Sequence, residues 1–554
     1  MDNQPDTQQD DNLAAPGIPA PEGAANLIDT DYQIGQDNYS TSKFGIRIDI
    51  HGAVFMFSSL VVLAFVIITL ALPDQAGPLF DSMRKWITGN LSWFFLLAGN
   101  IFVLVCLGLI VSPLGKIRIG GGRAEPDFSY ISWFAMLFAA GMGVGLMFYG
   151  VSEPLGHYAS SLGGTALGEN GLRSDWAPLA GAAGDEMAAM RLGMAATIFH
   201  WGLHPWAIYA VVSLSLAIFS YNKGLPLTVR SIFYPILGER IWGWPGHIID
   251  ILAVFATLFG LATSLGIGAQ QAASGLNYLF GIPEGNITLV LLIVGITAVA
   301  LVSIVAGVDK GVKRLSEINM ALAFLLLMFM VFVGPTLLIA SGFVQNIGHY
   351  LMELPFLSNP FGREDTNFSQ GWTAFYWAWW ISWSPFVGMF IARVSRGRSV
   401  REFLVAVLLV PSTVSVFWMT AFGSTAINQL MNGFEGAKDA ALSVQLFEVL
   451  GQLPLTGITS FIGIVLVIVF FITSSDSGSL VIDTITSGGK IDAPKPQRVF
   501  WGILEGAIAI ALLVGGGLGA LQAMAVSTGL PFTLVLLAGC YAIIRGLMSE
   551  PRPK

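Results

Sequence analysis

Aromatic side chains crowd one short stretch of an otherwise apolar chain. Residues 375–386 read FYWAWWISWSPF. At 100° per residue, Tyr376, Trp379, Trp380 and Trp383 share one face of a helix. The face of an aromatic ring attracts a cation by roughly 0.5–2 kcal/mol. The pattern favours a box for a quaternary ammonium, which has no N–H donor, over one for a sugar, whose hydroxyls need many polar partners.

A second aromatic stretch could complete such a box. Residues 199–209 read FHWGLHPWAIY, which brings Trp201, Trp206 and Tyr209 onto one more apolar segment. The competing interpretation is an aromatic belt at a membrane surface. However, an uncharged stretch runs on from Asn367, and the 375–386 cluster begins eight residues, or about 12 Å at 1.5 Å per residue, after that position. That depth favours a binding box over a belt.

Glycines interrupt another apolar segment. Residues 138–150 read FAAGMGVGLMFYG, in which Gly141, Gly143 and Gly145 alternate. Small residues allow close helix packing, but three alternate glycines each weaken a helix by about 1 kcal/mol relative to Ala. We expect local unwinding, which membrane proteins tolerate where the backbone lines a cavity. Free carbonyls there could bind a cation, and free N–H groups a carboxylate.

Two hydroxyls suggest which ion would be bound. Thr473 and Ser474 lie in FFITSSDSGS, residues 470–479. Alone, such hydroxyls more often bond back to their own helix. Together with open carbonyls near Gly141–Gly145, they would form a hard-oxygen site for sodium.

The elements that must position these groups are membrane-spanning helices. The chain has 554 residues, of which 54% are hydrophobic and 11% charged, against about 25% charged in soluble domains. We predict an all-α membrane protein with twelve spans, each long enough to cross about 30 Å. They lie near 50–72, 90–112, 130–153, 193–219, 247–275, 287–307, 317–341, 371–393, 402–425, 456–475, 498–518 and 525–547.

Charge and helix breaks suggest how the spans are arranged. Most of the 27 Lys and Arg residues fall in segments that are cytoplasmic if the N-terminus is, so we expect both termini inside. Ser382–Pro385 would break the eighth span as the glycines break the third. Broken helices in matching positions are typical of inverted repeats in transporters. We therefore expect spans 3–7 and 8–12 to be repeats of five helices, preceded by two extra helices.

The chain then divides into six parts. We expect a disordered acidic cytoplasmic tail, two peripheral helices, a first repeat, an extracellular loop with an interfacial helix, a second repeat and a short cytoplasmic C-terminus. Their bounds are 1–45, 46–115, 128–341, 342–370, 371–548 and 549–554.

Several motifs resemble one transporter family over about residues 45–547. GMGVGLMFYGVSEP, FHWGLHPWAIY and FYWAWWISWSPFVGMFIARVSRGRS are similar to the betaine/carnitine/choline transporters, and most of all to their sodium-coupled glycine betaine permeases. The resemblance implies a LeuT-like fold and a homotrimer. It also implies a cage of Trp201, Trp206, Tyr209 and Trp380, with Trp377, Trp379 and Trp383 along the neighbouring path.

The same resemblance implies ligands for sodium as the coupling ion. One site would use the carbonyls of Ala139, Met142 and Phe470 with the hydroxyls of Thr473 and Ser474. A second would use Thr257 and Phe386, although Leu261 stands where the family's permeases have another threonine.

We therefore predict a sodium-coupled importer of glycine betaine in the cell (inner) membrane, with no cofactor and no nucleic-acid partner. Ectoine or proline symport, sodium-independent exchange and proton-coupled choline uptake remain alternatives, and Gly145 argues against the last two. We find no nucleophile or metal cluster for an enzyme. His200 and His204 lack an evident third ligand, and Glu153 at a span end could simply meet water.

Overall fold

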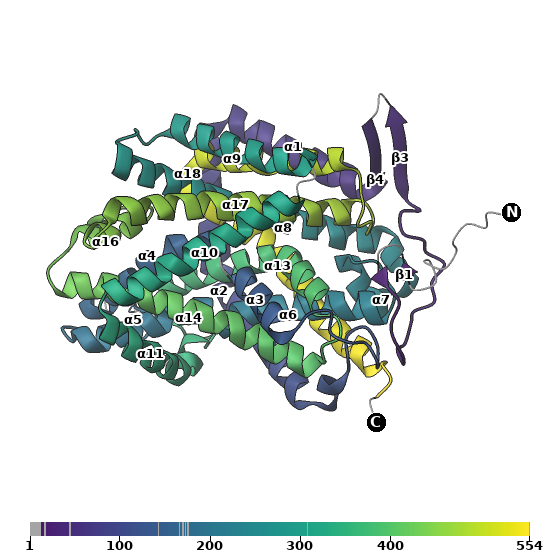
Figure 1. Cartoon of the computed structure of the whole chain (residues 1–554), viewed down its shortest axis with the longest axis horizontal. Coiled ribbons are helices and arrows are strands. Elements are labelled where there is room, and N and C mark those ends of the chain that lie inside the picture. Colours follow the sequence, from purple (N-terminus) through teal and green to yellow (C-terminus); the bar gives the residue numbers. More distant parts are fainter. Residues whose placement is uncertain are drawn as a thin grey trace.

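The computed structural model describes residues 13–15, 18–43, 46–141, 143–164, 167–168, 171, 173, 177–306 and 309–552. Long helices run roughly side by side along one axis (Figure 1). The helices are α1 Gly52–Ala71, α2 Pro73–Val111, α3 Tyr130–Gly141, α4 Val144–Gly163, α5 Glu186–Trp201, α6 Leu203–Ala217, α7 Tyr234–Leu237, α8 Trp244–Phe280, α9 Asn286–Ala306, α10 Asp309–Val333, α11 Thr336–Leu357, α12 Thr366–Phe368, α13 Ala374–Val394, α14 Val400–Met431, α15 Gly436–Asp439, α16 Gln445–Gly451, α17 Thr456–Thr486 and α18 Lys495–Met548.

The all-helical membrane class is confirmed. In the described part of the chain, nine helices are long and apolar enough to span a membrane, or ten if α3 and α4 form one bent span. Every predicted span falls on a helix. However, α13 is not among the nine, and α18 counts once although non-helical Gly516 and Gly517 divide it. Gly517 has φ 62° and ψ −147°, a conformation that essentially only glycine adopts. The number twelve stays a prediction.

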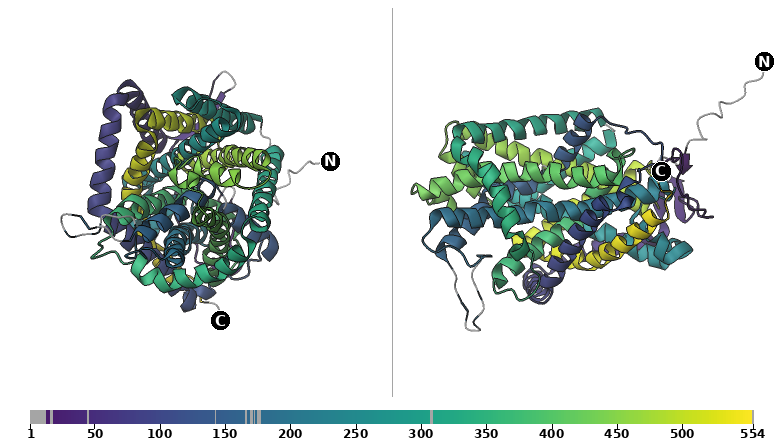
Figure 2. Two further views of the ribbon diagram at one scale, coloured as in Figure 1. Left: turned by 90° about the vertical axis from the view of Figure 1, so that its left-hand side faces the viewer. Right: turned by 90° about the horizontal axis from the view of Figure 1, so that it is seen from below.

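Burial separates central helices from those that face lipid. In the most apolar window of Glu186–Asn222, which covers α5 and α6, 94% of residues are buried inside the protein, against 22% for α9. Helix α13 packs against α6, α8 and α18. An end-on view shows central helices ringed by others (Figure 2). The aromatic helix α13 therefore lies within the bundle.

The predicted break in the third span is confirmed. Helices α3 and α4 are bent by 64° relative to each other. Gly143, just before α4, has an extended backbone with φ −167° and ψ −178°. The glycine-rich stretch thus ends one helix and starts another in the middle of the apolar segment.

The predicted break in the eighth span is wrong. Helix α13 continues through Pro385 to Val394. Proline lacks an N–H, so the carbonyl of Ile381, four residues earlier, loses its usual donor. The hydroxyl of Ser384 donates to that carbonyl at 2.7 Å instead. The paired breaks from which we predicted the inverted repeat are therefore not both present.

The predicted end of the seventh span also shifts. Helix α10 ends at Val333 and α11 begins at Thr336, so the predicted span 317–341 runs too far. Pro335 caps α11, and a proline ring blocks continuation of the preceding helix. Most of α11 lies in the predicted loop 342–370, where we expected an interfacial helix.

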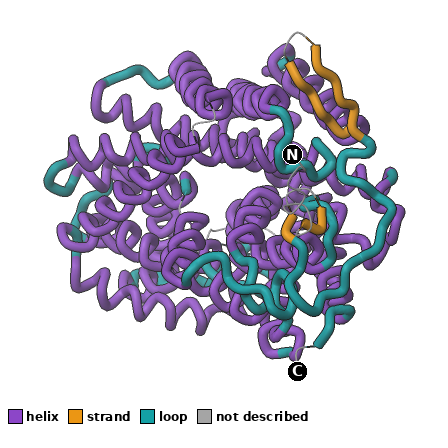
Figure 3. The backbone as a smooth tube through the Cα atoms, turned by 45° about the vertical axis from the view of Figure 1, so that its right-hand side comes forward, coloured by secondary structure: helices purple, strands orange, loops and turns teal. Residues whose placement is uncertain are grey.

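Much of the predicted N-terminal tail is ordered. Strands β3 Asn38–Lys43 and β4 Ile46–His51 pair in antiparallel register, and β1 Leu13–Ala15 pairs with β2 Ile18–Pro19. Both hairpins lie at one end of the bundle (Figure 3). Ile18 is only 1% exposed. The disordered-tail prediction is therefore wrong for the described part of residues 1–45.

A buried ion pair holds the connection between α6 and α8. Arg230 Nε lies 2.5 Å from Asp250 Oδ2, and both side chains are almost fully buried. The Arg230 backbone N–H also donates to Asp250 Oδ1 at 3.0 Å. The charges of Arg230 and Asp250 therefore compensate each other only while the two side chains stay paired.

We expect Asp250→Ala to reduce the free energy of unfolding by about 3–5 kcal/mol, because it leaves the Arg230 guanidinium buried and unpaired. Thermal unfolding of the purified protein would measure this loss. The double variant Arg230→Met/Asp250→Leu should lose less than the single variant. A double variant that is at least as unstable would contradict this account.

Candidate functional site

A small cavity lies where α4, α5, α6 and α13 meet. Its volume is about 60 Å³. The helix break contributes backbone on one side, and aromatic rings form much of the rest. The residues that line it are Ala140, Gly143, Val144, Gly145, Leu146, Trp201, Tyr209, Ser264, Trp379, Trp380, Trp383, Val387 and Ser474.

Four aromatic rings surround this cavity in a box-like arrangement. The centroids of Trp201 and Trp380 lie 5.1 Å apart with the rings at 87°. Tyr209 meets Trp380 at 5.8 Å, also at 87°. Trp379 stacks against Trp380 at 5.6 Å. Rings at right angles present several faces to one point, which suits a compact cation.

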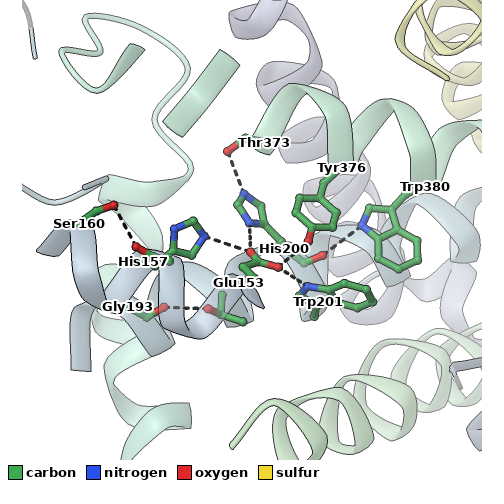
Figure 4. A network of polar contacts seen from close by, with 11 residues as sticks. Glu153, His157, Ser160, Gly193, His200, Trp201, Thr373, Tyr376 and Trp380 are labelled. Carbon is green, nitrogen blue, oxygen red and sulfur yellow. Dashed lines mark hydrogen bonds and ion pairs between the residues drawn. The ribbon is translucent and has the colours of Figure 1, made fainter. Parts of the chain in front are cut away.

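Hydrogen bonds of the indole N–H groups set these orientations. Trp201 Nε1 donates to Glu153 Oε2 at 2.7 Å, and Trp380 Nε1 donates to the carbonyl of His200 at 3.1 Å. Trp379 Nε1 donates to Ser264 Oγ at 3.1 Å. Figure 4 shows the first two contacts. Each ring is therefore held by an acceptor on another helix.

Two predicted aromatic residues lie elsewhere. Trp206 does not line the cavity and packs its ring against Tyr209 at 5.3 Å. Trp377 is fully buried and stacks on His204, with ring centroids 5.4 Å apart. It thus points away from the cavity, toward Gly99 in α2, and its predicted place along the path is wrong. Trp383 does line the cavity.

Two glycines of the helix break lie at the cavity, while their role in binding stays a prediction. Gly143 and Gly145 both line the cavity. A Cβ at Gly145 would lie 2.8 Å from Trp201 Cη2 and 3.0 Å from Trp379 Cη2, so a side chain there would displace the rings. Gly141 ends α3. Met142 lies outside the described residues.

A larger cavity adjoins the aromatic one and contains most of the predicted sodium ligands. It measures about 270 Å³ and shares Ala140, Trp383, Val387 and Ser474 with the smaller cavity. Its lining also includes the predicted ligands Ala139, Phe386, Phe470 and Thr473. The fold thus brings α3 and α17 together at the helix break.

The hydroxyl of Thr473 bonds within its own helix here. It donates to the carbonyls of Phe470, at 3.0 Å, and Val469, at 3.1 Å. This is the local arrangement that we weighed against a sodium site. Ser474 lines both cavities, so its hydroxyl is available between them.

The second predicted sodium site is not assembled. Thr257 donates to the carbonyl of Ala253 at 2.7 Å and does not line the larger cavity. Leu261, at the position of the missing threonine, packs against Gly478 of α17; a Cβ on that glycine would lie 2.4 Å from Leu261 Cδ1. An apolar helix contact replaces the expected oxygen ligand.

A third cavity lies on the other side of the aromatic box. It measures about 350 Å³ and is lined in part by Tyr149, Trp372 and Phe375. The Tyr149 ring packs 6.3 Å from Trp201 and 6.1 Å from Trp379. A layer of rings thus separates this cavity from the box, whereas the 270 Å³ cavity shares residues with it.

The sequence analysis named Glu153 but left its role open. It is fully buried, and its carboxylate contacts His157, His200, Trp201 and Tyr376. The expectation that it meets water is wrong. The i, i+4 spacing of Glu153 and His157 was a local signal, because such residues share a helix face.

Among the residues that the structure describes, no third ligand joins His200 and His204, but two other ligand-type side chains lie close to His200 alone. Single ligand atoms of Glu153, His157 and His200 lie within 4.8 Å of one another. His204 points elsewhere, with Nε2 2.9 Å from Asn100 Oδ1. The two histidines of the FHWGLH motif therefore bond to different partners, His200 to Glu153 and His204 to Asn100.

Comparison with known proteins finds relatives over most of the chain. A family model for betaine/carnitine/choline family transporters matches residues 53–552. A glycine betaine/proline/choline transporter of Vibrio parahaemolyticus is 65% identical over 97% of both chains. A glycine betaine transporter from the same bacterium is 54% identical, over 95% of this chain and 98% of its own. A glycine betaine transporter of Bacillus subtilis is 43% identical, over 90% and 95%.

A solved structure of a Na⁺-coupled sialic acid symporter covers 82% of this chain and 87% of its own, at 14% identity and a TM-score of 0.42, a similarity too low to support a conclusion. The family match and the close relatives are decisive. The chain is an integral membrane transporter of the betaine/carnitine/choline family, and not an enzyme.

Proposed function

We propose that this protein is a sodium-coupled importer of glycine betaine. The observation that carries the proposal is the convergence of Trp201, Tyr209 and Trp380 on one small cavity. Three close relatives are named for glycine betaine. A trimethylammonium group would lie against the ring faces, each worth roughly 0.5–2 kcal/mol.

The other end of a zwitterion also has a complementary group. Helix α4 begins at Val144, and Val144, Gly145 and Leu146 line the cavity. The N-terminus of a helix carries unpaired N–H groups and a partial positive charge. A substrate carboxylate would be stabilised there. Trp206 would support the cage from behind Tyr209 rather than touch the substrate.

Sodium would bind between α3 and α17. Ala139, Phe470, Thr473 and Ser474 line one cavity, and hydroxyl and carbonyl oxygens suit a hard cation. Because betaine is neutral overall, each sodium ion moves one net charge, worth about 2.3 kcal/mol at 100 mV. A tenfold sodium gradient adds about 1.4 kcal/mol. One ion would then support accumulation of several hundred-fold; Leu261 argues for that single ion over two.

The wider architecture follows from the family. We propose twelve spans with two five-helix repeats, both termini cytoplasmic, and a homotrimer. The 270 Å³ cavity would then open toward the cytoplasm, since Arg393 in its lining lies three residues before Arg396, which pairs with Glu22 near the N-terminus. The cage would be connected to the inside and closed to the outside.

The proposed function is tested by uptake of labelled glycine betaine into proteoliposomes, with and without an inward sodium gradient. We expect accumulation only with the gradient, and its loss in Trp380→Leu, because that change removes one ring of the cage. Trp93→Leu, an exposed indole outside the three cavities, is the matched control.

Each other result points to a different transporter. Accumulation of ectoine or proline but not betaine would keep the mechanism and change the substrate. Uptake indifferent to sodium would indicate exchange, and uptake of choline driven by a proton gradient would indicate a proton-coupled carrier.

Removing the sodium ligands should weaken the response to sodium. We expect Thr473→Ala and Ser474→Ala each to raise the sodium concentration for half-maximal uptake by about tenfold, equivalent to about 1.4 kcal/mol. Thr459→Ala is the control, since Thr459 lies in the same helix and bonds to its own carbonyls. An unchanged sodium dependence in both variants would refute this site.

Adding one methyl group to the cage should weaken betaine binding. In Gly145→Ala the new Cβ would press on Trp201 and Trp379, and we expect the KM for glycine betaine to rise at least tenfold. Gly163→Ala is the control, because Gly163 is in the same helix with open space around its Cβ position. Equal effects of the two changes would show that helix propensity, not ring displacement, is responsible.

A further inference from the structure

A buried carboxylate joins three of the helices that form the cage. Glu153, in α4, is fully buried. Its Oε2 accepts hydrogen bonds from Trp201 Nε1 at 2.7 Å and Tyr376 Oη at 2.6 Å. Its Oε1 lies 2.5 Å from His200 Nδ1 and 3.2 Å from His157 Nε2. Figure 4 shows the carboxylate at the centre of these groups.

Such a carboxylate needs all of its partners. Burying a charge in an apolar interior is costly unless hydrogen bonds and opposite charge compensate it. A carboxylate has about four lone-pair sites, and four donor groups surround this one. The histidines can supply the compensating proton. The network is therefore satisfied only when all of these side chains keep their places.

Two branches of the network lead to the cage. Trp201 donates to Glu153 and its ring lines the cavity. His200 is held on one side by Glu153 and on the other by Thr373 Oγ1 at 2.9 Å. The carbonyl of His200 then accepts from Trp380 Nε1. The perpendicular pair Trp201–Trp380 is thus anchored through one carboxylate.

A third branch braces the same pair. The ring of Tyr376 stacks on His200, with centroids 4.7 Å apart, and meets Trp201 edge-on at 5.6 Å. Tyr376 lies one helical turn before Trp380 on α13. Its hydroxyl therefore ties α13 to α4 next to the cage.

We propose that Glu153 is a positioning residue for the substrate cage. Its carboxylate holds Trp201 directly, and Trp380 through His200, at the mutual angle that presents both ring faces to a quaternary ammonium. Glu153 does not touch the substrate. The inference rests on the proposed betaine function. It states that Glu153 affects how tightly the substrate binds and not how fast it is transported.

Glu153→Gln tests this role. Glutamine keeps the shape but has one acceptor oxygen and no charge, so only one side of the network keeps its acceptor, and His200 must change its tautomer to keep a hydrogen bond to the amide N–H. We expect the KM for glycine betaine to rise about tenfold, with Vmax within twofold of wild type at saturating sodium. Tyr376→Phe removes only one donor and leaves the cage rings intact, so a smaller rise of two- to fivefold is expected.

The control is Glu505→Gln, the same change at another buried carboxyl, which bonds to Ser475 and does not line the cage cavity. It should leave the KM for betaine unchanged. Thermal unfolding of every variant separates positioning from simple destabilisation. A Glu153→Gln variant with lower stability but an unchanged KM would overturn the proposal. If Glu153→Gln does not fold, the same result in Tyr376→Phe would overturn it.

Two further results are distinguishable. If Trp380→Leu leaves uptake intact, both the cage and the proposed function are wrong. If Trp380→Leu abolishes uptake but Glu153→Gln keeps the wild-type KM, only the positioning role of Glu153 is wrong.

Glu153, His157 and His200 could instead hold a metal ion. Loss of betaine binding on EDTA treatment of wild type, with recovery on adding Zn²⁺, would overturn positioning in favour of that role.

Discussion

The aromatic site depends on the hydrogen bonds of the indole N–H groups that surround it, because burying an N–H without an acceptor costs free energy. Trp201, Trp379, Trp380 and Trp383 each do so, on Glu153, Ser264, His200 and Gly260 respectively. Each acceptor belongs to a different helix from the ring that it holds. Four rings on neighbouring helices are thus fixed in direction, and their remaining faces are left for a ligand.

Helix irregularities determine where backbone polar groups are available. At Gly143 the chain is extended between α3 and α4, so backbone groups border the cavity. At Pro385 the carbonyl freed by the proline is taken by Ser384, and α13 stays a continuous support for its aromatic side chains. The break at Gly143 therefore provides polar backbone groups to the site, and the continuous helix α13 provides a rigid support.

The two ends of the bundle differ in how they are held. At the end that carries the hairpins, buried ion pairs hold the chain together. Lys223 and Glu550, 2.5 Å apart, link segments far apart in the sequence, and Arg230 and Asp250 hold the connection between α6 and α8. Toward the cavity lined by Tyr149, Trp372 and Phe375, packed rings and the Glu153 network close the space. The packed rings would have to move apart to open this side of the site. Such an arrangement is compatible with alternating access, in which one side of a site opens while the other stays closed.

The sequence by itself determined the helical membrane class, a helix at each predicted span, the break near Gly143 and the family, although several helices begin or end ten or so residues from the predicted bounds. These follow from local properties, since hydropathy and glycine spacing act within one segment. Helical periodicity also separated Trp377 from the face shared by Tyr376, Trp379, Trp380 and Trp383, and the structure agrees with that separation rather than with the path role implied by resemblance. Only the tertiary structure decided that Ser384 keeps α13 intact and that Glu153 meets His200 and Tyr376, which lie 47 and 223 residues away. Periodicity states which side chains share a face, but the neighbour that meets this face depends on how the helices pack.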